Sequence, residues 1–183
     1  MASFLFQSTI VSRWNANNNQ MNASVALFLT FLLGSTAFAA PAKSIVASEF
    51  PGYQLLASSE FAPELLKASK SPSITKGHFR SQAAEFAAVI RDAKGRAGTL
   101  FSAKLVVCKF AKPYSCATIL SFETRLPYDQ RLATIPKKDA GCLNSGEART
   151  PIGDGVALHG RKGTFDYFVF NGSKFIGCDP GEP

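Results

Sequence analysis

An apolar run near the N-terminus decides how much of this chain is left to fold into a domain. Residues 25–33 carry no charge, but nine residues are too few to cross a bilayer, which needs about 20 in a helix. Small residues follow, and Ala37-Phe38-Ala39 fits the small-x-small rule of signal peptidase. We therefore predict that residues 1–39 are a cleaved signal peptide and that residues 40–183 form a single secreted domain.

Two features of the leader leave alternatives open. Arg13 is its only charged residue and lies well upstream of the apolar run, while Met21 offers an internal start. A mitochondrial transit peptide is the competing interpretation because acids are absent, but a single arginine and an apolar rather than amphipathic run disfavour it. No second long apolar run follows and the tail is polar, so we expect no membrane anchor.

The segment after residue 39 has the size and composition of one globular domain. It holds 144 of the 183 residues, which is enough for a hydrophobic core, and the loss of Arg13 lowers the net charge from +7 to +6. Its lysines and arginines are scattered. This charge supports weak, salt-sensitive binding to RNA or to another anionic surface, and ordinary solubility explains it equally well.

All four cysteines lie in this segment, at Cys108, Cys116, Cys142 and Cys178. An even number in a secreted chain predicts two disulfides, with three pairings open. Cys108 and Cys116 flank a predicted hairpin loop, so a local bridge is one solution, and it would leave Cys142 to pair with Cys178. A zinc site is disfavoured because there is no C-x-x-C motif and only two histidines. We expect neither a metal nor another cofactor.

The strongest helical pattern covers residues 71–95. Ser71 is a favourable N-cap, Pro72 suits the first helical position, and Gly95 supplies a C-terminal stop. Apolar residues recur between them at steps of mostly three and four, which predicts the main helix of the domain here. These residues are Ile74, Phe79, Ala83, Phe86, Ala87 and Ile90.

The segments before this helix give weaker patterns. Residues 40–48 are small and predict a loose lead, and residues 53–57 predict a short strand. Residues 58–70 predict a short helix with Pro63 in its first turn, where a missing N–H has no consequence.

After residue 98 the pattern changes to strands. Residues 100–110 alternate polar and apolar side chains, residues 111–115 have the composition of a turn, and residues 116–125 predict a second strand. Residues 126–150 are polar and rich in turn formers, which predicts a long loop. A short strand at 156–158 follows.

The clearest local signal is a hairpin near the C-terminus. Residues 164–170 are rich in aromatic side chains and predict a strand. Asn171-Gly172 is the strongest two-residue hairpin turn, and residues 174–178 predict the second strand of the hairpin. Both faces of the first strand are partly apolar, which predicts a central strand buried on both sides; docking of a partner protein on one face is the alternative. Asn171-Gly172-Ser173 is also a sequon, so Asn171 is a candidate N-glycosylation site.

Together these elements predict an α+β fold, with one main helix packed on a twisted antiparallel sheet and two disulfides. This plan, with Asp166-Tyr-Phe-Val-Phe-Asn171 and Phe175-Ile-Gly177, resembles the small fungal secreted ribonucleases. It resembles even more the ribonuclease-like effectors of plant-pathogenic fungi, which keep the scaffold without the activity. The resemblance implies a secreted, monomeric virulence effector that binds a host protein or RNA without catalysis, outside the fungus or after uptake into a host cell.

The chain departs from that family at its functional positions. Leu55 stands where the effectors often carry a cysteine, and Tyr167 replaces a guanidinium on the penultimate strand. Cys178-Asp179-Pro180 follows the hairpin, where the family has its catalytic histidine. These departures indicate a pseudo-ribonuclease rather than an enzyme.

A diverged ribonuclease that cleaves single-stranded RNA is the alternative function. Cleavage through the 2′-hydroxyl needs a base, an acid on the leaving oxygen and cations around the phosphorane. Glu123 shares a strand face with Arg125, and His159 is close in sequence to Arg161, so Glu123, His159 and Arg161 are the candidate catalytic residues. Each also fits a solvated surface residue, and His78 is a weaker candidate. A third hypothesis is a secreted inhibitor of a host hydrolase or peroxidase.

Overall fold

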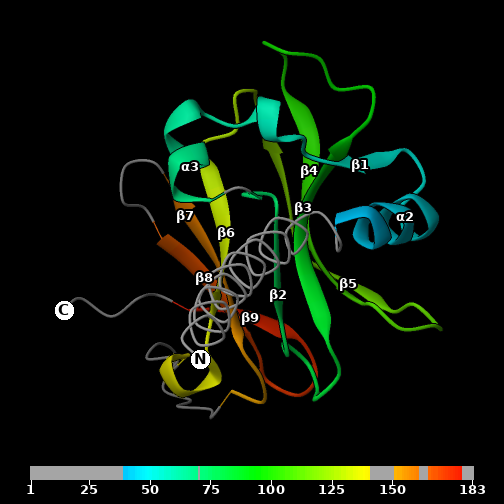
Figure 1. Ribbon diagram of the computed structural model, residues 1–183, viewed down its shortest axis with the longest axis vertical. Helices are drawn as coiled ribbons and strands as arrows, with labels where there is room; N and C mark the ends of the chain where they lie inside the picture. Colours follow the sequence, from blue (N-terminus) through cyan, green and yellow to red (C-terminus); the bar gives the residue numbers. More distant parts are fainter. Residues whose placement is uncertain (1–38, 70, 141–150, 161–164, 179–183) are drawn as a thin grey trace, which may run out of the picture. The chain divides into compact units, whose positions relative to one another are not determined.

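The computed structural model describes residues 39–69, 71–140, 151–160 and 165–178, which form two antiparallel sheets and one main helix (Figure 1). The elements in chain order are α2 (Ala39–Glu49), β1 (Tyr53–Leu55), η1 (Ser58–Glu60), α3 (Pro63–Ala68), β2 (Ile74–Gly77), β3 (Glu85–Asp92), β4 (Phe101–Lys109), β5 (Cys116–Thr124), β6 (Gln130–Ile135), η2 (Lys137–Asp139), β7 (Gly155–Gly160), β8 (Phe165–Phe170) and β9 (Phe175–Cys178).

Each sheet is built from strands that are mostly neighbours in the chain. Sheet 1 has the order β1-β3-β4-β5, and β2 pairs with the same edge of β3 as β1 does, further along the strand. Sheet 2 is the four-stranded meander β6-β7-β8-β9. Every strand pair is antiparallel, as expected where short turns join consecutive strands.

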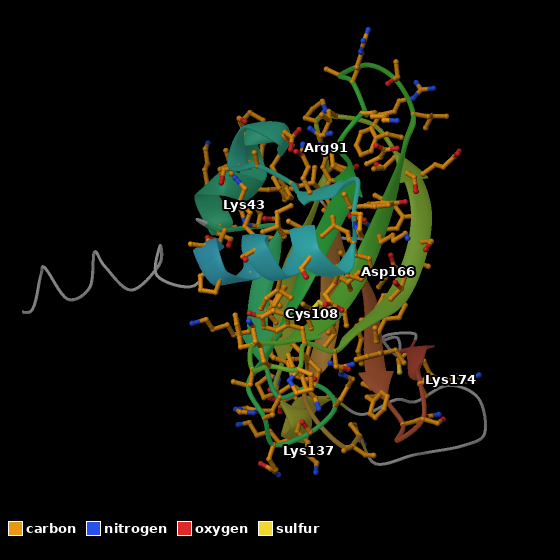
Figure 2. The ribbon with its side chains drawn as sticks, turned by 90° about the vertical axis from the view of Figure 1, so that its right-hand side faces the viewer. Lys43, Arg91, Cys108, Lys137, Asp166 and Lys174 are labelled. Carbon is orange, nitrogen blue, oxygen red and sulfur yellow. A yellow bond between two sulfur atoms is a disulfide. The ribbon has the colours of Figure 1, made fainter. Side chains whose placement is uncertain are left out.

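Strand β3 is buried on both faces, and this burial sets the layers of the fold. Ala87 and Val89 belong to the core between the two sheets. Because side chains alternate along a strand, Phe86, Ala88 and Ile90 point to the opposite, outward face of sheet 1. All five are completely buried. On that outward face lies α2 (Figures 1 and 2), whose buried side chains are Ala42, Ile45 and Val46.

The core between the sheets is closed at one end by the η1–α3 segment. The backbone N–H of Ala62 donates to the carbonyl of Tyr128 over 2.9 Å, and the N–H of Tyr128 donates to the carbonyl of Glu60 over 2.8 Å. The ring of Phe61 meets the buried Tyr128 ring edge-on, with centroids 5.5 Å apart. Burial is the main cause that raises the pKa of Tyr128, with smaller contributions from Asp129 and Asp166. The backbone hydrogen bonds and the ring contact of Tyr128 fix where sheet 2 begins.

Side-chain and backbone hydrogen bonds join the two sheets where β2 lies beside β6. The hydroxyls of Thr75 and Thr134 are 2.8 Å apart, and the Thr134 hydroxyl donates to the carbonyl of Lys76 over 2.6 Å. The N–H of Leu132 donates to the carbonyl of Pro72 over 2.8 Å. Polar groups at this edge are therefore satisfied without a continuous ladder of strand pairing.

The predicted main helix over residues 71–95 is wrong, because that segment forms β2 and β3. Its spacing fits a helix, but residues 86–90 are a continuous apolar run, which a strand buried on both faces also requires. The main helix is α2 instead, in the segment predicted to be loose. Its buried residues Ala42, Ile45 and Val46 are spaced three and four apart, as in an amphipathic helix. Only two of them are larger than alanine, so the amphipathic pattern in the sequence is weak.

The predicted long loop over residues 126–150 is also wrong in its first half, where β6 and η2 lie. The remaining predicted elements are confirmed. They are the strand at β1, the short helix α3 with Pro63 as its first residue, the β4–β5 hairpin, the strand at β7, and the β8–β9 hairpin. Gly172 has a φ of 104°, a left-handed conformation that glycine adopts without strain. Strand β8 is central in sheet 2, as predicted, but it is not fully buried on both faces: Tyr167 and Val169 are buried on one face, and Phe168 on the other is half-buried.

The mixed fold with one main helix and antiparallel strands is thus confirmed. The prediction of a single sheet is wrong, because the strands form two sheets that share a core, and one disulfide, not two, is found in the described residues. Cys108 and Cys116 face each other across β4 and β5 and are bridged, as the hairpin position predicted. Cys142 lies outside the described residues. Cys178 is buried on β9.

Replacement of both Cys108 and Cys116 by serine should lower the free energy of unfolding by about 2–3 kcal/mol, because the unfolded hairpin regains its loop entropy. Urea unfolding followed by circular dichroism measures the change. Ser115→Ala, in the same loop, leaves the bridge in place and serves as the control. Coincident unfolding curves for the double variant and the control would contradict a stabilising role for the bridge.

Candidate functional site

His159 lies on the outward face of sheet 2. On β7, Val156 and Leu158 belong to the core between the sheets, so the alternating His159 points away from it. Its direct neighbour across the β6–β7 pair is Arg131. Burial, and then the positive charge of Arg131, lower the pKa of His159. The imidazole is half-buried beside a guanidinium, and both the burial and the neighbouring charge disfavour its protonated form.

Glu123 lies on the outward face of sheet 1. Its neighbour across the β4–β5 pair is Ser102, whose hydroxyl is 3.2 Å from the hydroxyl of Tyr53 on the same outward face. The Glu123 side chain is exposed, and Arg125 follows the end of the strand, also exposed. Glu123 and Arg125 therefore lie at a strand end that is exposed to solvent.

The structure does not bring the candidate catalytic residues together. Glu123 and His159 belong to different sheets, and each points outward from the shared core. Arg161, the third candidate, lies outside the described residues. Neither Glu123 nor His159 lines the pocket beside Arg91 and Glu60.

A pocket of about 440 Å³ is found beside a buried ion pair that the sequence did not single out. Arg91, at the end of β3, bonds to the Glu60 carboxylate and donates to the carbonyls of Asp92 and Gly95. Its Nε is buried and has no hydrogen-bond partner among the described residues. Leu126 and Pro127 complete the wall with Ser59 and Ala97. Since Glu60 neutralises the guanidinium, the pair acts as a tie between β3 and η1 rather than as an anion site.

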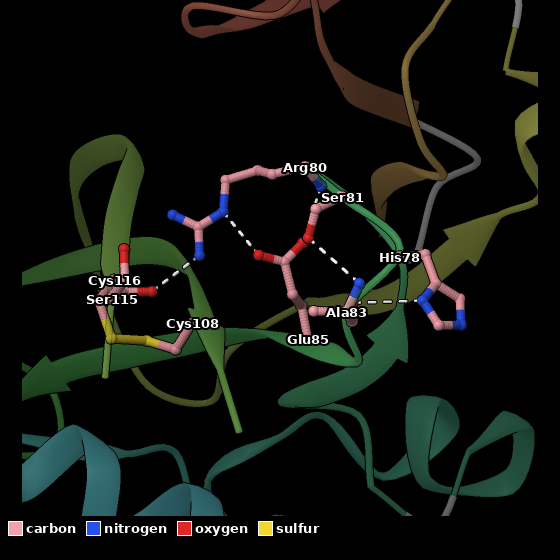
Figure 3. Close-up of polar contacts among 8 residues, drawn as sticks. All are labelled: His78, Arg80, Ser81, Ala83, Glu85, Cys108, Ser115 and Cys116. Carbon is pink, nitrogen blue, oxygen red and sulfur yellow. Dashed lines mark hydrogen bonds and ion pairs between the residues drawn. A yellow bond between two sulfur atoms is a disulfide. The ribbon is translucent and has the colours of Figure 1, made fainter. Parts of the chain in front are cut away.

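A second buried ion pair lies at the other end of β3 (Figure 3). The Glu85 side chain is fully buried; one carboxylate oxygen accepts from Arg80 Nε and the other from the Arg80 backbone N–H, both over 2.7 Å. Arg80 also donates to the carbonyl of Ser115 over 2.7 Å, next to the Cys108–Cys116 bridge. The pair therefore ties the β2–β3 loop to the β4–β5 hairpin.

The carboxylate of Asp154 joins two further loops. It accepts from the backbone N–H of His78 over 2.9 Å and from that of Lys137 over 3.0 Å. Gly153 is required beside it, because a Cβ at this position would lie 1.9 Å from the carbonyl oxygen of His78. His78, the weaker catalytic candidate, thus takes part in a structural contact through its backbone.

The side chain of Asn171, the candidate glycosylation site, is engaged in its own turn. Its oxygen accepts from the backbone N–H groups of Ser173 and Lys174 and from the Ser173 hydroxyl, each over 3.0 Å. This is an Asx-type turn, which stabilises the hairpin that the sequence predicted.

Neither a metal centre nor a membrane-spanning helix is found in the described residues. No group of three or more histidine, cysteine or acidic side chains there is placed to hold a metal ion. Of the helices that the structure describes, none combines the length and apolar character of a membrane span.

Comparison with known proteins gives no relative. No family model, no curated protein and no solved structure matches the chain. The candidate site therefore has to be judged on its own geometry.

The imidazole of His159 should titrate below the ordinary histidine value of about 6.5. Because the unfolded chain then binds the proton first, this group makes the fold less stable as the pH falls through about 6.5. NMR titration of Arg131→Gln should show a higher midpoint than the wild type, still below 6.5 since burial remains. A wild-type midpoint at or above 6.5, or no response to Arg131→Gln, would contradict this environment.

Arg80→Met should lower the free energy of unfolding by about 3 kcal/mol or more, because it leaves the Glu85 carboxylate buried without its cation. Arg125→Met, at an exposed arginine, is the matched control and should change stability by less than about 0.5 kcal/mol. The double variant Arg80→Met/Glu85→Gln should recover part of the loss. Equal denaturation midpoints for the two single variants would rule out a structural ion pair.

Proposed function

We propose that this chain is a small exported effector-type protein that acts by binding a host macromolecule, without catalysis. The observation that carries the proposal is the placement of the candidate catalytic residues. Glu123 and His159 lie on outward faces of different sheets, so they are not arranged as the acid and base of one reaction. A rigid sandwich that presents loops and strand faces is suited to binding.

The buried charges support the same proposal. Arg80 with Glu85, and Arg91 with Glu60, are paired inside the fold, where each pair ties a loop to strand β3. An active site keeps some charged groups available to a substrate. Among the described residues, the buried charges serve the fold instead.

Export is supported by the leader sequence and by the bridged β4–β5 hairpin. Disulfides persist in oxidising compartments, and Cys108–Cys116 is such a bridge. We extend the proposal to a second bridge between Cys142 and Cys178, the latter buried and not a free thiol. The predicted cleavage point after Ala39 lies at the first residue of α2 and leaves its buried side chains in the mature chain.

The resemblance to fungal ribonuclease-like effectors loses one of its supports in this structure. The resemblance was based on a plan whose main helix was predicted over residues 71–95, and these residues form strands. The hairpin of β8 and β9, which carries the best local match, is present. The proposal therefore depends on the export signal, the bridge and the dispersed charges more than on the family.

Incubation of the purified chain with labelled single-stranded RNA tests the absence of catalysis. We expect no cleavage above the background of the His159→Ala variant, because Glu123 and His159 lie on outward faces of different sheets. Denaturing gels and detection of cyclic phosphate ends provide the measurement. Cleavage to cyclic phosphates by the wild type that His159→Ala abolishes would overturn the proposal in favour of a diverged ribonuclease.

A further inference from the structure

Five loop segments lie together at one end of the sandwich, joined by hydrogen bonds. Arg80 links the β2–β3 loop to the β4–β5 hairpin, and Asp154 links the β2–β3 loop to residues 136–140. The N–H of Ile152 donates to the carbonyl of Phe170, at the start of the β8–β9 turn, over 3.4 Å. We call this set the loop end; it comprises residues 78–84, 110–115, 136–140, 151–154 and 171–174.

The loop end and the strand ends beside it carry an excess of positive charge. Figure 2 shows Lys137 and Lys174 at this lower end of the molecule, away from Arg91. The described acids here are Asp139 and Asp154, together with Glu85, whose charge Arg80 balances. The described cations are Lys76, Arg80, Lys109, Lys112, Lys137, Lys138 and Lys174.

At the opposite end, the described residues show no excess of positive charge, because they include as many acidic as basic side chains. Its cations are Lys67, Arg91, Lys94, Arg96, Arg125 and Arg131, and its acids are Glu60, Glu64, Asp92, Glu123, Asp129 and Asp166. The charge of the described domain is therefore polarised along the strands, which the scattered lysines of the sequence did not reveal.

Apolar and aromatic side chains accompany the cations at the loop end. Ile152 is 45% exposed, and a Cβ at the hairpin residue Gly172 would lie 3.1 Å from it. Tyr114 is half-buried in the β4–β5 hairpin, with Lys112 Nζ 5.7 Å from its ring centre. Aromatic and aliphatic side chains among lysines are typical of segments that enter the headgroup region of a bilayer.

We propose that the loop end docks on a bilayer surface of anionic phospholipids. Several separate loop tips can contact one flat anionic surface at the same time, and each lysine near such a surface adds about 1 kcal/mol, or about fivefold in affinity. The exposed Ile152 favours lipid over nucleic acid, since it can enter the acyl boundary and has no equivalent partner on a phosphate backbone. This docking is peripheral, and it goes beyond the proposed function because it does not depend on the absence of catalysis.

Vesicle sedimentation of the full chain tests the docking surface. The vesicles are pure phosphatidylcholine or phosphatidylcholine with 30% phosphatidylserine, a composition chosen to give roughly the anionic surface of a cytoplasmic leaflet. The test variant is Lys137→Glu/Lys138→Glu/Lys174→Glu, and the matched control is Lys43→Glu/Lys67→Glu/Lys94→Glu. All six lysines are exposed, and both triple variants have the same net charge. Every protein keeps residues 25–33, so any binding by that run is common to all.

We expect the wild type to bind the anionic vesicles at least tenfold more strongly than neutral ones. The loop-end variant should lose at least tenfold of this affinity, the control less than threefold, and Ile152→Ala about threefold at unchanged charge. Equal losses in the two triple variants, no preference for anionic vesicles, or tight binding of a single-stranded RNA oligonucleotide without vesicle binding would each overturn the proposal. RNA cleavage is a separate readout, so failure here leaves the proposed function in place.

Discussion

The burial of strand β3 on both faces is the constraint on which the rest of the structure depends. Residues 86–90 are apolar and fully buried, so the fold needs a second sheet on one side and a cover on the other. Glu85 and Arg91, the charged residues that flank this apolar run, are therefore also buried. Each requires a partner of opposite charge, which Arg80 and Glu60 supply.

These two ion pairs explain how the fold positions its surfaces. One pair holds η1 against the end of β3, and the other joins the β2–β3 loop to the bridged hairpin of β4 and β5. The loops are thereby fixed to a rigid sandwich although they lie at its end. Polar groups left outside the core, among them Glu123 and His159, are distributed over the outward faces of two different sheets.

The sequence predicted local features well and the layers poorly. Hairpins and the Cys108–Cys116 bridge depend on neighbours in the chain, and these were found where expected, except that the β8–β9 turn is centred on Gly172-Ser173 rather than on Asn171-Gly172. Residues 86–90 were assigned to a helix because their spacing fits one, and only their burial from both sides decides for a strand. Strand β6 mixes polar and apolar residues, and it is held by pairing with β7 and by contacts of Thr134 with β2, which lie far away in the sequence. The Glu85 and Arg91 pairs were missed, although charges that flank an apolar run were a signal for them.

Native-state hydrogen exchange of the β3 amides tests this account most directly. The account predicts that the amides of residues 86–91 are among the slowest to exchange and open only with global unfolding, since both neighbours and both faces protect them. Backbone chemical shifts in the same spectra should be those of an extended strand. Fast exchange of these amides, or helical shifts over residues 71–95, would contradict the two-sheet arrangement and with it the separation of Glu123 from His159.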